Sequence, residues 1–204
     1  RGDGRAVLRS SIREYLASEA MHHLGIASSR ALALFDSNEI IYREQAETAA
    51  MLLRCAKSHI RFGHFEYFFH QNKSDQLDQL IDYCLARYYQ TTGTREENII
   101  LMLESIVDKT AEMLAQWQAV GFQHGVMNTD NMSILGDTID YGPYGFMESY
   151  DPAWVANYSD HEARYAFERQ PGVALWNLNC LLHCFSKHLT RSQLVSILSK
   201  YETK

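Results

Sequence analysis

The feature that most constrains the fold is a polar stretch from His124 to Asn131, which a short apolar run joins to Thr138–Phe146. Asn131 and Asp140 stand nine positions apart, with the turn-forming pair Gly136–Asp137 between them. This spacing predicts a β-hairpin that brings both oxygen ligands to one end. Mg²⁺ prefers oxygen ligands, usually one or two carboxylates, and leaves its other positions to water and phosphate. The stretch therefore predicts a nucleotide and metal site.

The same stretch resembles the metal-binding segments of protein kinases, with one departure. Kinases hold their metal ions with a catalytic-loop Asn and with the Asp of a D-F-G triplet, which Asp140–Tyr141–Gly142 resembles. If His124 begins an H-x-D-x-x-x-x-N loop, the Asn falls correctly at 131, but position 126 is valine. Because valine cannot accept a proton, Asp130 is the nearby carboxylate of the loop that can act as a base.

Longer runs of sequence carry a resemblance to a known family. The segments His124–Gly136 and Thr138–Phe146 resemble the signature of the selenoprotein O (YdiU) family, kinase-fold proteins that transfer AMP to proteins. Gly4–Met21 and Ser58–Gly63 also resemble that family, so the resemblance covers most of the first 150 residues. Since the match is long, contiguous and rich in polar residues, it is far more specific than a lone D-F-G triplet.

The resemblance implies nucleotide contacts outside the central stretch. Arg1–Arg5 is by itself a glycine-broken polar turn, and the resemblance places Asp3 and Gly4 at positions that contact the nucleotide. Arginine suits phosphate because its planar fork donates paired hydrogen bonds and keeps its charge. Two surface arginines are usually just solvated, so it is the resemblance that assigns Arg54 and Arg61 to the nucleotide phosphates.

Glu14 lies in a predicted amphipathic helix. Apolar residues recur every four positions from Leu8 to Leu24, and Gly25 is expected to end the helix. The residues leave two roles open for Glu14: a capping box with Ser11, or the helix glutamate that pairs with the nucleotide-binding lysine of kinase-like folds. The resemblance favours the second.

The remaining pattern predicts short strands followed by helices. Strands are expected over Ala31–Phe35 and Ile40–Arg43, joined by a turn at Asp36–Asn38, and over Ala49–Arg54. Helices are expected over Phe62–His70, Ser74–Tyr88, from Thr94 through Trp117 to just before Gly121, from Pro171 to about Leu189, and over Ser192–Tyr201. Capping is expected from Ser74, Thr94 and Ser192. The aromatic residues Phe65, Phe68 and Phe69 are expected to be core rather than a stacking platform.

Together these elements predict an α+β, protein-kinase-like fold with a partial N-lobe and a mostly helical C-lobe. Residues 1–54 would be the remnant of the N-lobe, a helix with short strands, and residues 55–204 the C-lobe with the catalytic loop and metal site. The sequence begins at Arg1 and contains no G-x-G-x-x-G motif. We therefore expect a piece of a longer protein that lacks the N-terminal and C-terminal parts, including a glycine-rich loop and a nucleotide-binding lysine.

Composition excludes several classes of protein. Hydrophobic residues make up 46% of the 204 residues, which is ample for a core. No apolar run approaches the roughly 18 residues of a membrane span, and no secretory signal is visible, so we expect a cytoplasmic protein without a membrane partner. The net charge of −6 argues against a nucleic-acid partner.

The cysteines offer an alternative interpretation, a second metal site. Cys180 and Cys184 lie one helical turn apart, with His183 and His188 nearby. Free cysteine is among the most buried residue types, so reduced core residues are the commoner explanation.

The predicted function is that of a protein adenylyltransferase, which transfers AMP from ATP to Ser, Thr or Tyr hydroxyls of protein substrates. In this prediction Asn131 and Asp140 hold Mg²⁺, or alternatively Mn²⁺. Arg54 and Arg61 hold the phosphates, and Asp130 is the catalytic general base.

Two alternatives remain. One is a phosphotransferase of the same fold, against which Val126 counts. The other is a non-catalytic pseudokinase scaffold that binds nucleotide, against which retention of both metal ligands counts.

Overall fold

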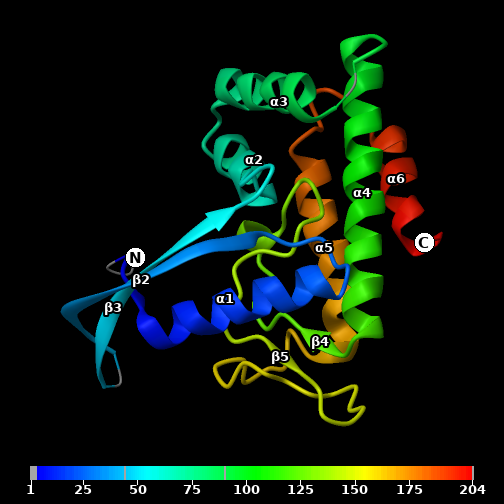
Figure 1. Cartoon of the computed structure of the whole chain (residues 1–204). Helices are drawn as coiled ribbons and strands as arrows, with labels where there is room; N and C mark the ends of the chain where they lie inside the picture. The colour runs from blue at the N-terminus through cyan, green and yellow to red at the C-terminus, as the bar shows by residue number, and fades with distance from the viewer. Residues whose placement is uncertain (1–3, 44, 90, 204) are drawn as a thin grey trace.

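The computed structural model describes residues 4–43, 45–89 and 91–203. It contains an antiparallel sheet with one helix alongside, followed by a helical part built around one long helix (Figure 1). The prediction of a mixed α+β fold is confirmed. The division into lobes at residue 54 stays a prediction.

Helix α1 (Leu8–His23) ends as predicted, with Gly25 at φ +79° after the C-cap residue Leu24. Its buried face differs from the predicted leucine and isoleucine stripe: Ile12 and Leu16 are 41% and 61% exposed. The buried residues are mainly small ones, namely Ser11, Ala17, Ser18 and Met21. Small side chains allow α1 to lie close against the sheet strands that it packs on. Ser11 is therefore an interior residue, and the predicted Ser11–Glu14 capping box is wrong.

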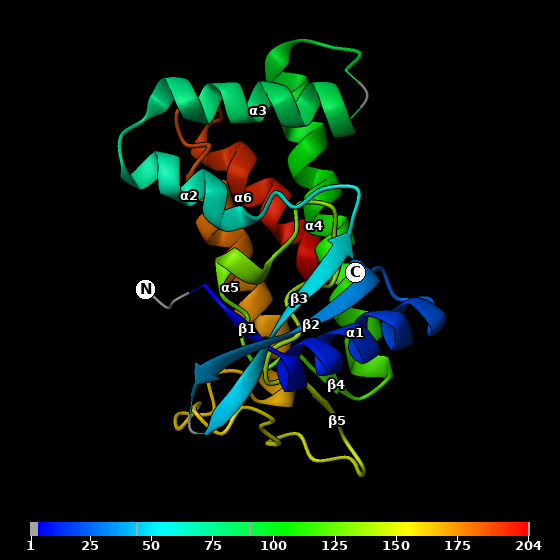
Figure 2. The ribbon, with the colours of Figure 1, turned by 60° about the vertical axis from the view of Figure 1, so that its left-hand side comes forward.

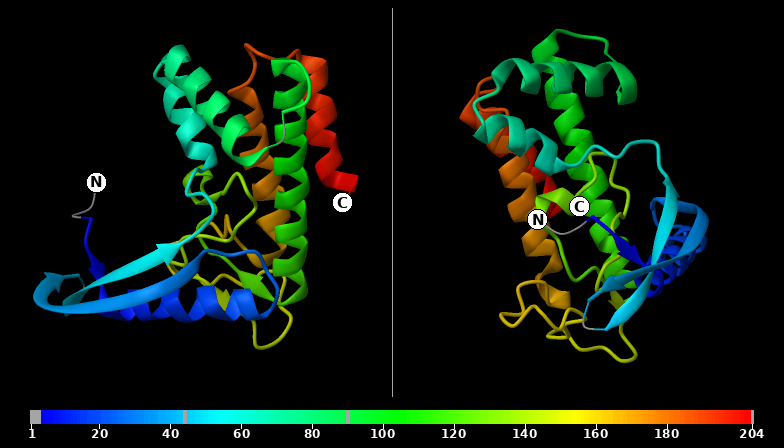
Figure 3. Two further views of the ribbon diagram at one scale, coloured as in Figure 1. Left: turned by 45° about the horizontal axis from the view of Figure 1, so that its top comes forward. Right: turned by 90° about the vertical axis from the view of Figure 1, so that its left-hand side faces the viewer.

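Three strands form the sheet, in the order β1 (Ala6–Val7), β3 (Ala46–Cys55) and β2 (Arg30–Tyr42). The predicted turn at Asp36–Asn38 is wrong, because β2 continues through it and Tyr42 is paired with Ala46. The turn-prone residues instead form an irregularity between Asp36 and Ile40, where the Ser37 hydroxyl accepts the Glu39 N–H at 3.1 Å. Figure 3 shows the β2–β3 hairpin projecting from the helices, with α1 running along it.

The helical part consists of five helices in the described residues (Figure 2), namely α2 (Phe62–His70), α3 (Ser74–Tyr88), α4 (Arg95–Ala119), α5 (Gln170–His183) and α6 (Arg191–Ser199). Three short 3₁₀ helices are described, namely η1 (Thr129–Asn131), η2 (Phe167–Arg169) and η3 (Lys200–Thr203). A second, two-stranded sheet is formed by β4 (Phe122–Gln123) and β5 (Gly145–Phe146).

Most predicted helix bounds are close to these. The exceptions are α5, which ends at His183 rather than near Leu189, and α6, which is capped by Thr190 rather than Ser192. Ser74 also opens α3 without capping it, since the N-cap residue is Lys73.

The core surrounds α4, which contacts α3, α5, α6 and β4. Trp117 is 1% exposed, and Phe65 of α2 is fully buried against Phe185. Phe68 and Phe69 are partly buried against the same core, so the prediction that this aromatic stripe is core is confirmed.

The stretch between Asn131 and Asp140 does not fold back on itself as the predicted hairpin. Its turn exists, since Gly136 N–H donates to the Ser133 carbonyl at 3.3 Å. Ser133, however, forms an isolated antiparallel β-bridge with Arg61, and Thr138 forms an isolated parallel β-bridge with Ser28. The two arms thus pair with different neighbouring segments, which provide backbone partners that the short arms cannot give each other.

No helix within the described ranges is long and apolar enough to cross a membrane.

Candidate nucleotide and metal site

Side-chain amides from α5 fix the backbone of the loop that precedes the site. Gln170 is fully buried; its amide donates to the Phe122 carbonyl at 3.0 Å, and its oxygen accepts the His124 N–H at 3.0 Å. Asn177 donates to the Met127 carbonyl at 2.8 Å. These hydrogen bonds are buried and favour one loop conformation, although the Asn177 Oδ1 atom is buried without a partner among the described residues.

His124 links the loop to the Asp140–Tyr141–Gly142 triplet. Its ring is fully buried and stacked on Trp117, with 5.4 Å between the centroids. Its Nε2 lies 2.7 Å from the Ile139 carbonyl, which can only accept, so Nε2 carries a proton. Burial lowers the pKa of His124, so the ring is neutral at physiological pH. His124 therefore positions the residue immediately before Asp140.

Asp140 forms ion pairs with two arginines. It has φ +58°, a left-handed conformation that is uncommon for a residue other than glycine. One carboxylate oxygen lies 2.5 Å from Arg54 Nη1, and the other lies 2.9 Å from Arg61 Nη2. Arg54 Nη1 also lies 2.9 Å from the Glu14 carboxylate. The structure thus brings together four of the predicted residues from α1, β3, the segment before α2, and the Asp-Tyr-Gly triplet.

Each member of this cluster is about three-quarters withdrawn from solvent, with side-chain exposures of 21% to 28%. Burial raises the pKa of Glu14, and the Asp140 charge adds to that rise, while Arg54 opposes it. Burial by itself would lower the pKa of Arg54, but its hydrogen bonds and charges with Asp140 and Glu14 outweigh that and raise it. Arg54 is therefore held as a cation between two carboxylates. In the described residues Glu14 pairs with Arg54, and its pairing with a lysine stays a prediction.

Two contacts from the N-terminal elements to this segment were not found by sequence analysis. The buried Tyr141 hydroxyl hydrogen-bonds the Ser28 hydroxyl, across 113 positions. Arg13 of α1 donates to the Tyr144 carbonyl at 2.8 Å and lies over its ring. They hold the triplet and the residues after it against α1 and the segment before β2, and no spacing rule could reveal pairs so far apart in the chain.

Asn131 has one side-chain hydrogen bond that fixes the orientation of its amide. Its amide nitrogen donates to the Val126 carbonyl at 2.8 Å, so its side-chain oxygen points away from that contact. Asn131 and Asp140 both adjoin the start of α2: Met132 accepts the Phe62 N–H, and Asp140 pairs with Arg61.

One amide oxygen and one carboxylate fit Mg²⁺, which takes few protein ligands when phosphate oxygens are present. Within the described ranges, no group of three or more His, Cys, Asp or Glu side chains is placed to hold a metal ion. This finding includes the cysteines near the C-terminus. Cys184 is buried, and burial raises the pKa of its thiol to about 12, as in a core residue.

Asp130 makes no ion pair with the arginine cluster in the described residues. It is exposed in η1, and its carboxylate faces Gly63 near the start of α2. No ion pair of Asp130 is found among the described residues. Gly4 is exposed with φ +70°, and Asp3 lies outside the described residues, so their contact with a nucleotide stays a prediction.

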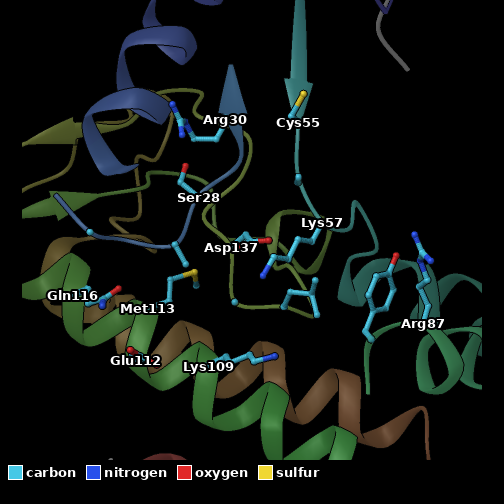
Figure 4. A pocket seen from close by; sticks show the side chains of 16 residues that line it. Ser28, Arg30, Cys55, Lys57, Arg87, Lys109, Glu112, Met113, Gln116 and Asp137 are labelled. Carbon is cyan, nitrogen blue, oxygen red and sulfur yellow. The ribbon is translucent and has the colours of Figure 1, made fainter. Parts of the chain in front are cut away.

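A separate cavity of about 680 Å³ is lined by residues from the end of β3, the linker after it, and α4 (Figure 4). Lys57, Lys109 and Asp137 line it, and none of the predicted site residues does. Burial raises the pKa of Asp137, while Lys57 and Lys109 oppose the rise. The cavity therefore has its own charged lining.

The whole sequence, residues 1–204, matches the family model described as protein adenylyltransferase SelO. The chain belongs to this family. It is 67% identical over 202 residues to the protein nucleotidyltransferase YdiU of Marinomonas sp. (strain MWYL1), covering 99% of this chain and 43% of that protein. It is 56% identical over 200 residues to the protein of the same name from Pseudoalteromonas atlantica, covering 98% of this chain and 42% of that one. The chain thus spans less than half the length of these SelO relatives.

Proposed function

We propose that this chain carries the nucleotide and metal site of a protein adenylyltransferase, which transfers AMP from ATP to Ser, Thr or Tyr hydroxyls of proteins. The observation that carries the proposal is the convergence of Arg54 and Arg61 on Asp140. A bound Mg²⁺–ATP would supply a cation for Asp140 and phosphates for the two arginines. The metal ion would therefore replace the arginines as partner of Asp140, and the phosphates would replace Asp140 as partner of the arginines. No charged group would be left unpaired.

The order of elements supports a kinase-like site. A helix with Glu14 precedes two long antiparallel strands, a linker, the helical part, an Asn-bearing loop and the Asp-Tyr-Gly triplet. This is the order of the corresponding parts in protein kinases. SelO family membership and the name of the relatives support nucleotide transfer as the reaction class.

In the proposed reaction the acceptor hydroxyl oxygen attacks the α-phosphorus of ATP. The bond from the α-phosphorus to the bridging oxygen breaks, pyrophosphate leaves, and the hydroxyl proton passes to Asp130. Arg54 and Arg61 neutralise charge on the leaving phosphates. Asn131 and Asp140 would hold Mg²⁺, which would neutralise phosphate charge and orient the nucleotide.

Val126 distinguishes this proposal from a kinase. Position 126 is where a kinase places its base, and valine cannot accept a proton. A nucleotide turned end for end would present its α-phosphorus, rather than its γ-phosphorus, to the acceptor. Asp130 is exposed and, among the described residues, free of any cation partner, so it is available to accept a proton.

The test is label transfer by the complete protein that contains this chain. Label from α-phosphate-labelled ATP should appear on protein hydroxyls, and label from γ-phosphate-labelled ATP should not. Asp130→Ala should slow transfer by roughly 10²-fold or more, the usual contribution of a general base, with little change in ATP affinity. Asp36→Ala, at an exposed carboxylate of β2, is the matched control and should transfer normally.

Other outcomes would decide between the alternatives. Transfer of the γ-label would assign a kinase. Transfer of neither label, with ATP still bound, would assign a nucleotide-binding scaffold.

A further inference from the structure

Gly63 lies where α2 meets the loop that carries Asp130. A Cβ atom added at Gly63 would lie 1.9 Å from Oδ1 of Asp130, 3.0 Å from its Cγ and 3.4 Å from its Cα. Heavy atoms do not approach to 1.9 Å, so no residue with a side chain can occupy position 63 while Asp130 keeps its place. Because the closest atom is the end of a side chain, the carboxylate would be the group that moves.

The backbone conformation does not explain a glycine here. Gly63 is not among the described residues with positive φ, and it stands in the first turn of a helix. Glycine in a helix is about 1 kcal/mol less favourable than alanine. In this structure, therefore, the advantage of glycine at position 63 is the space that it leaves for the Asp130 carboxylate.

The two segments cannot easily separate to make room. Phe62 N–H donates to the Met132 carbonyl at 3.0 Å, and Ile134 N–H donates to the Ile60 carbonyl at 3.2 Å. Both backbone hydrogen bonds lie just before Gly63 and just after Asp130 in the chain, next to the close contact. They join the start of α2 to the residues after η1, so the distance between the two backbones is fixed.

We infer that Gly63 is a positioning residue for the general base: it leaves the space in which the Asp130 carboxylate stands beside the acceptor hydroxyl. The inference rests on the proposed role of Asp130. It implies that glycine at position 63 makes α2 less stable than alanine would, and that it allows the observed position of the Asp130 carboxylate. A methyl group there should therefore affect stability and catalysis in opposite directions.

The experiment compares two glycine-to-alanine variants of the complete protein. Gly63→Ala should lower kcat for AMP transfer by about 10-fold to 100-fold, because a displacement of about 1 Å can cost 10²-fold. Its KM for ATP should change by less than about twofold, since the methyl group is aimed at the base and not at the arginines. Its melting temperature should stay the same or rise.

Gly172→Ala is the matched control. Gly172 also stands in the first turn of a helix, α5, and nothing lies within 4 Å of an added Cβ. This variant should keep kcat within about twofold of the wild type and show the same trend in melting temperature. The double variant Gly63→Ala/Asp130→Ala should be no slower than Asp130→Ala alone, because both changes act through one carboxylate.

Each contrary result overturns the inference in a distinguishable way. Wild-type kcat in Gly63→Ala together with a slow Asp130→Ala would overturn the role of Gly63 alone. Wild-type kcat in Asp130→Ala would overturn the proposed base, and with it the role of Gly63. A lowered melting temperature in Gly63→Ala would show that the backbone yields instead of the carboxylate, and a double variant slower than Asp130→Ala would show a second effect of the methyl group.

Discussion

Asp140 pairs with two arginines in the structure, and we propose a metal ion as its further partner. Its carboxylate is neutralised by Arg54 and Arg61, and the residues on either side of it are held by the contacts of His124 and Tyr141. With nucleotide, we propose that the same oxygens face a metal ion. Neither flanking contact involves a charged partner of Asp140, so both can persist when the carboxylate changes partners.

Replacing this carboxylate should separate catalysis from folding. Asp140→Ala in the complete protein should abolish Mg²⁺-dependent ATP turnover, because it removes a metal ligand, while the circular dichroism spectrum stays that of the folded protein. Asp137→Ala is the control, since Asp137 lies in the same segment and lines the separate cavity. Turnover near the wild-type rate in Asp140→Ala would refute the metal-ligand assignment.

At the scale of elements, the C-terminal end of α4 contacts the segment that leads to Asp140. It runs for 25 residues, and Trp117 in its last turns donates from Nε1 to the Thr138 hydroxyl at 2.9 Å. Its first turn is closed by a reciprocal capping box, in which Thr94 N–H donates to the Glu97 carboxylate at 2.7 Å and Glu97 N–H donates to the Thr94 hydroxyl at 3.3 Å. The end of α4 that supports the site lies far along the helix from this cap.

Removing the cap should therefore lower stability without touching catalysis. Thr94→Ala should reduce the free energy of unfolding by about 1 kcal/mol, the usual value of an N-cap hydroxyl, in a urea titration. Thr92→Ala, an exposed threonine two residues earlier whose side chain makes no described hydrogen bond, should change it by less than about 0.5 kcal/mol. Equal effects of the two substitutions would contradict the cap assignment.

At the scale of the whole molecule, stability should depend on pH through His124. Its folded pKa lies below the unfolded value near 6.5, so the unfolded chain binds more protons than the folded one in the interval between them. The contribution of the neutral ring is fully present above about pH 6.5 and is lost as the pH falls toward the folded pKa, at up to about 1.4 kcal/mol per pH unit.

The measurement is the free energy of unfolding of the wild type and of His124→Gln between pH 5 and pH 7.5. The variant should show a shallower fall on acidification, because its side chain does not titrate but can still donate to Ile139. Two other groups with shifted pKa values remain in both proteins. Burial also lowers the pKa of His188. The pKa of Glu14 is raised, so its contribution to the free energy of unfolding falls as the pH rises above its unfolded pKa near 4.5. Parallel pH profiles would show that His124 does not titrate differently in the folded and unfolded states.

The sequence by itself determined the features that depend on neighbours in the chain. The end of α1 at Gly25, the Thr94–Glu97 capping box and the extent of α2 were predicted from local patterns, because each depends on contacts within one or two helical turns. The family was also predicted, because its signature is a contiguous run of polar residues.

Only the tertiary structure decided which groups meet at the site. Arg54 and Asp140 are 86 positions apart, and the Ser28–Tyr141 and Gly63–Asp130 contacts likewise join distant segments. It also decided which face of α1 is buried and where the β2–β3 hairpin turns. These features depend on how close two packed backbones come, and a local pattern carries no information about that distance.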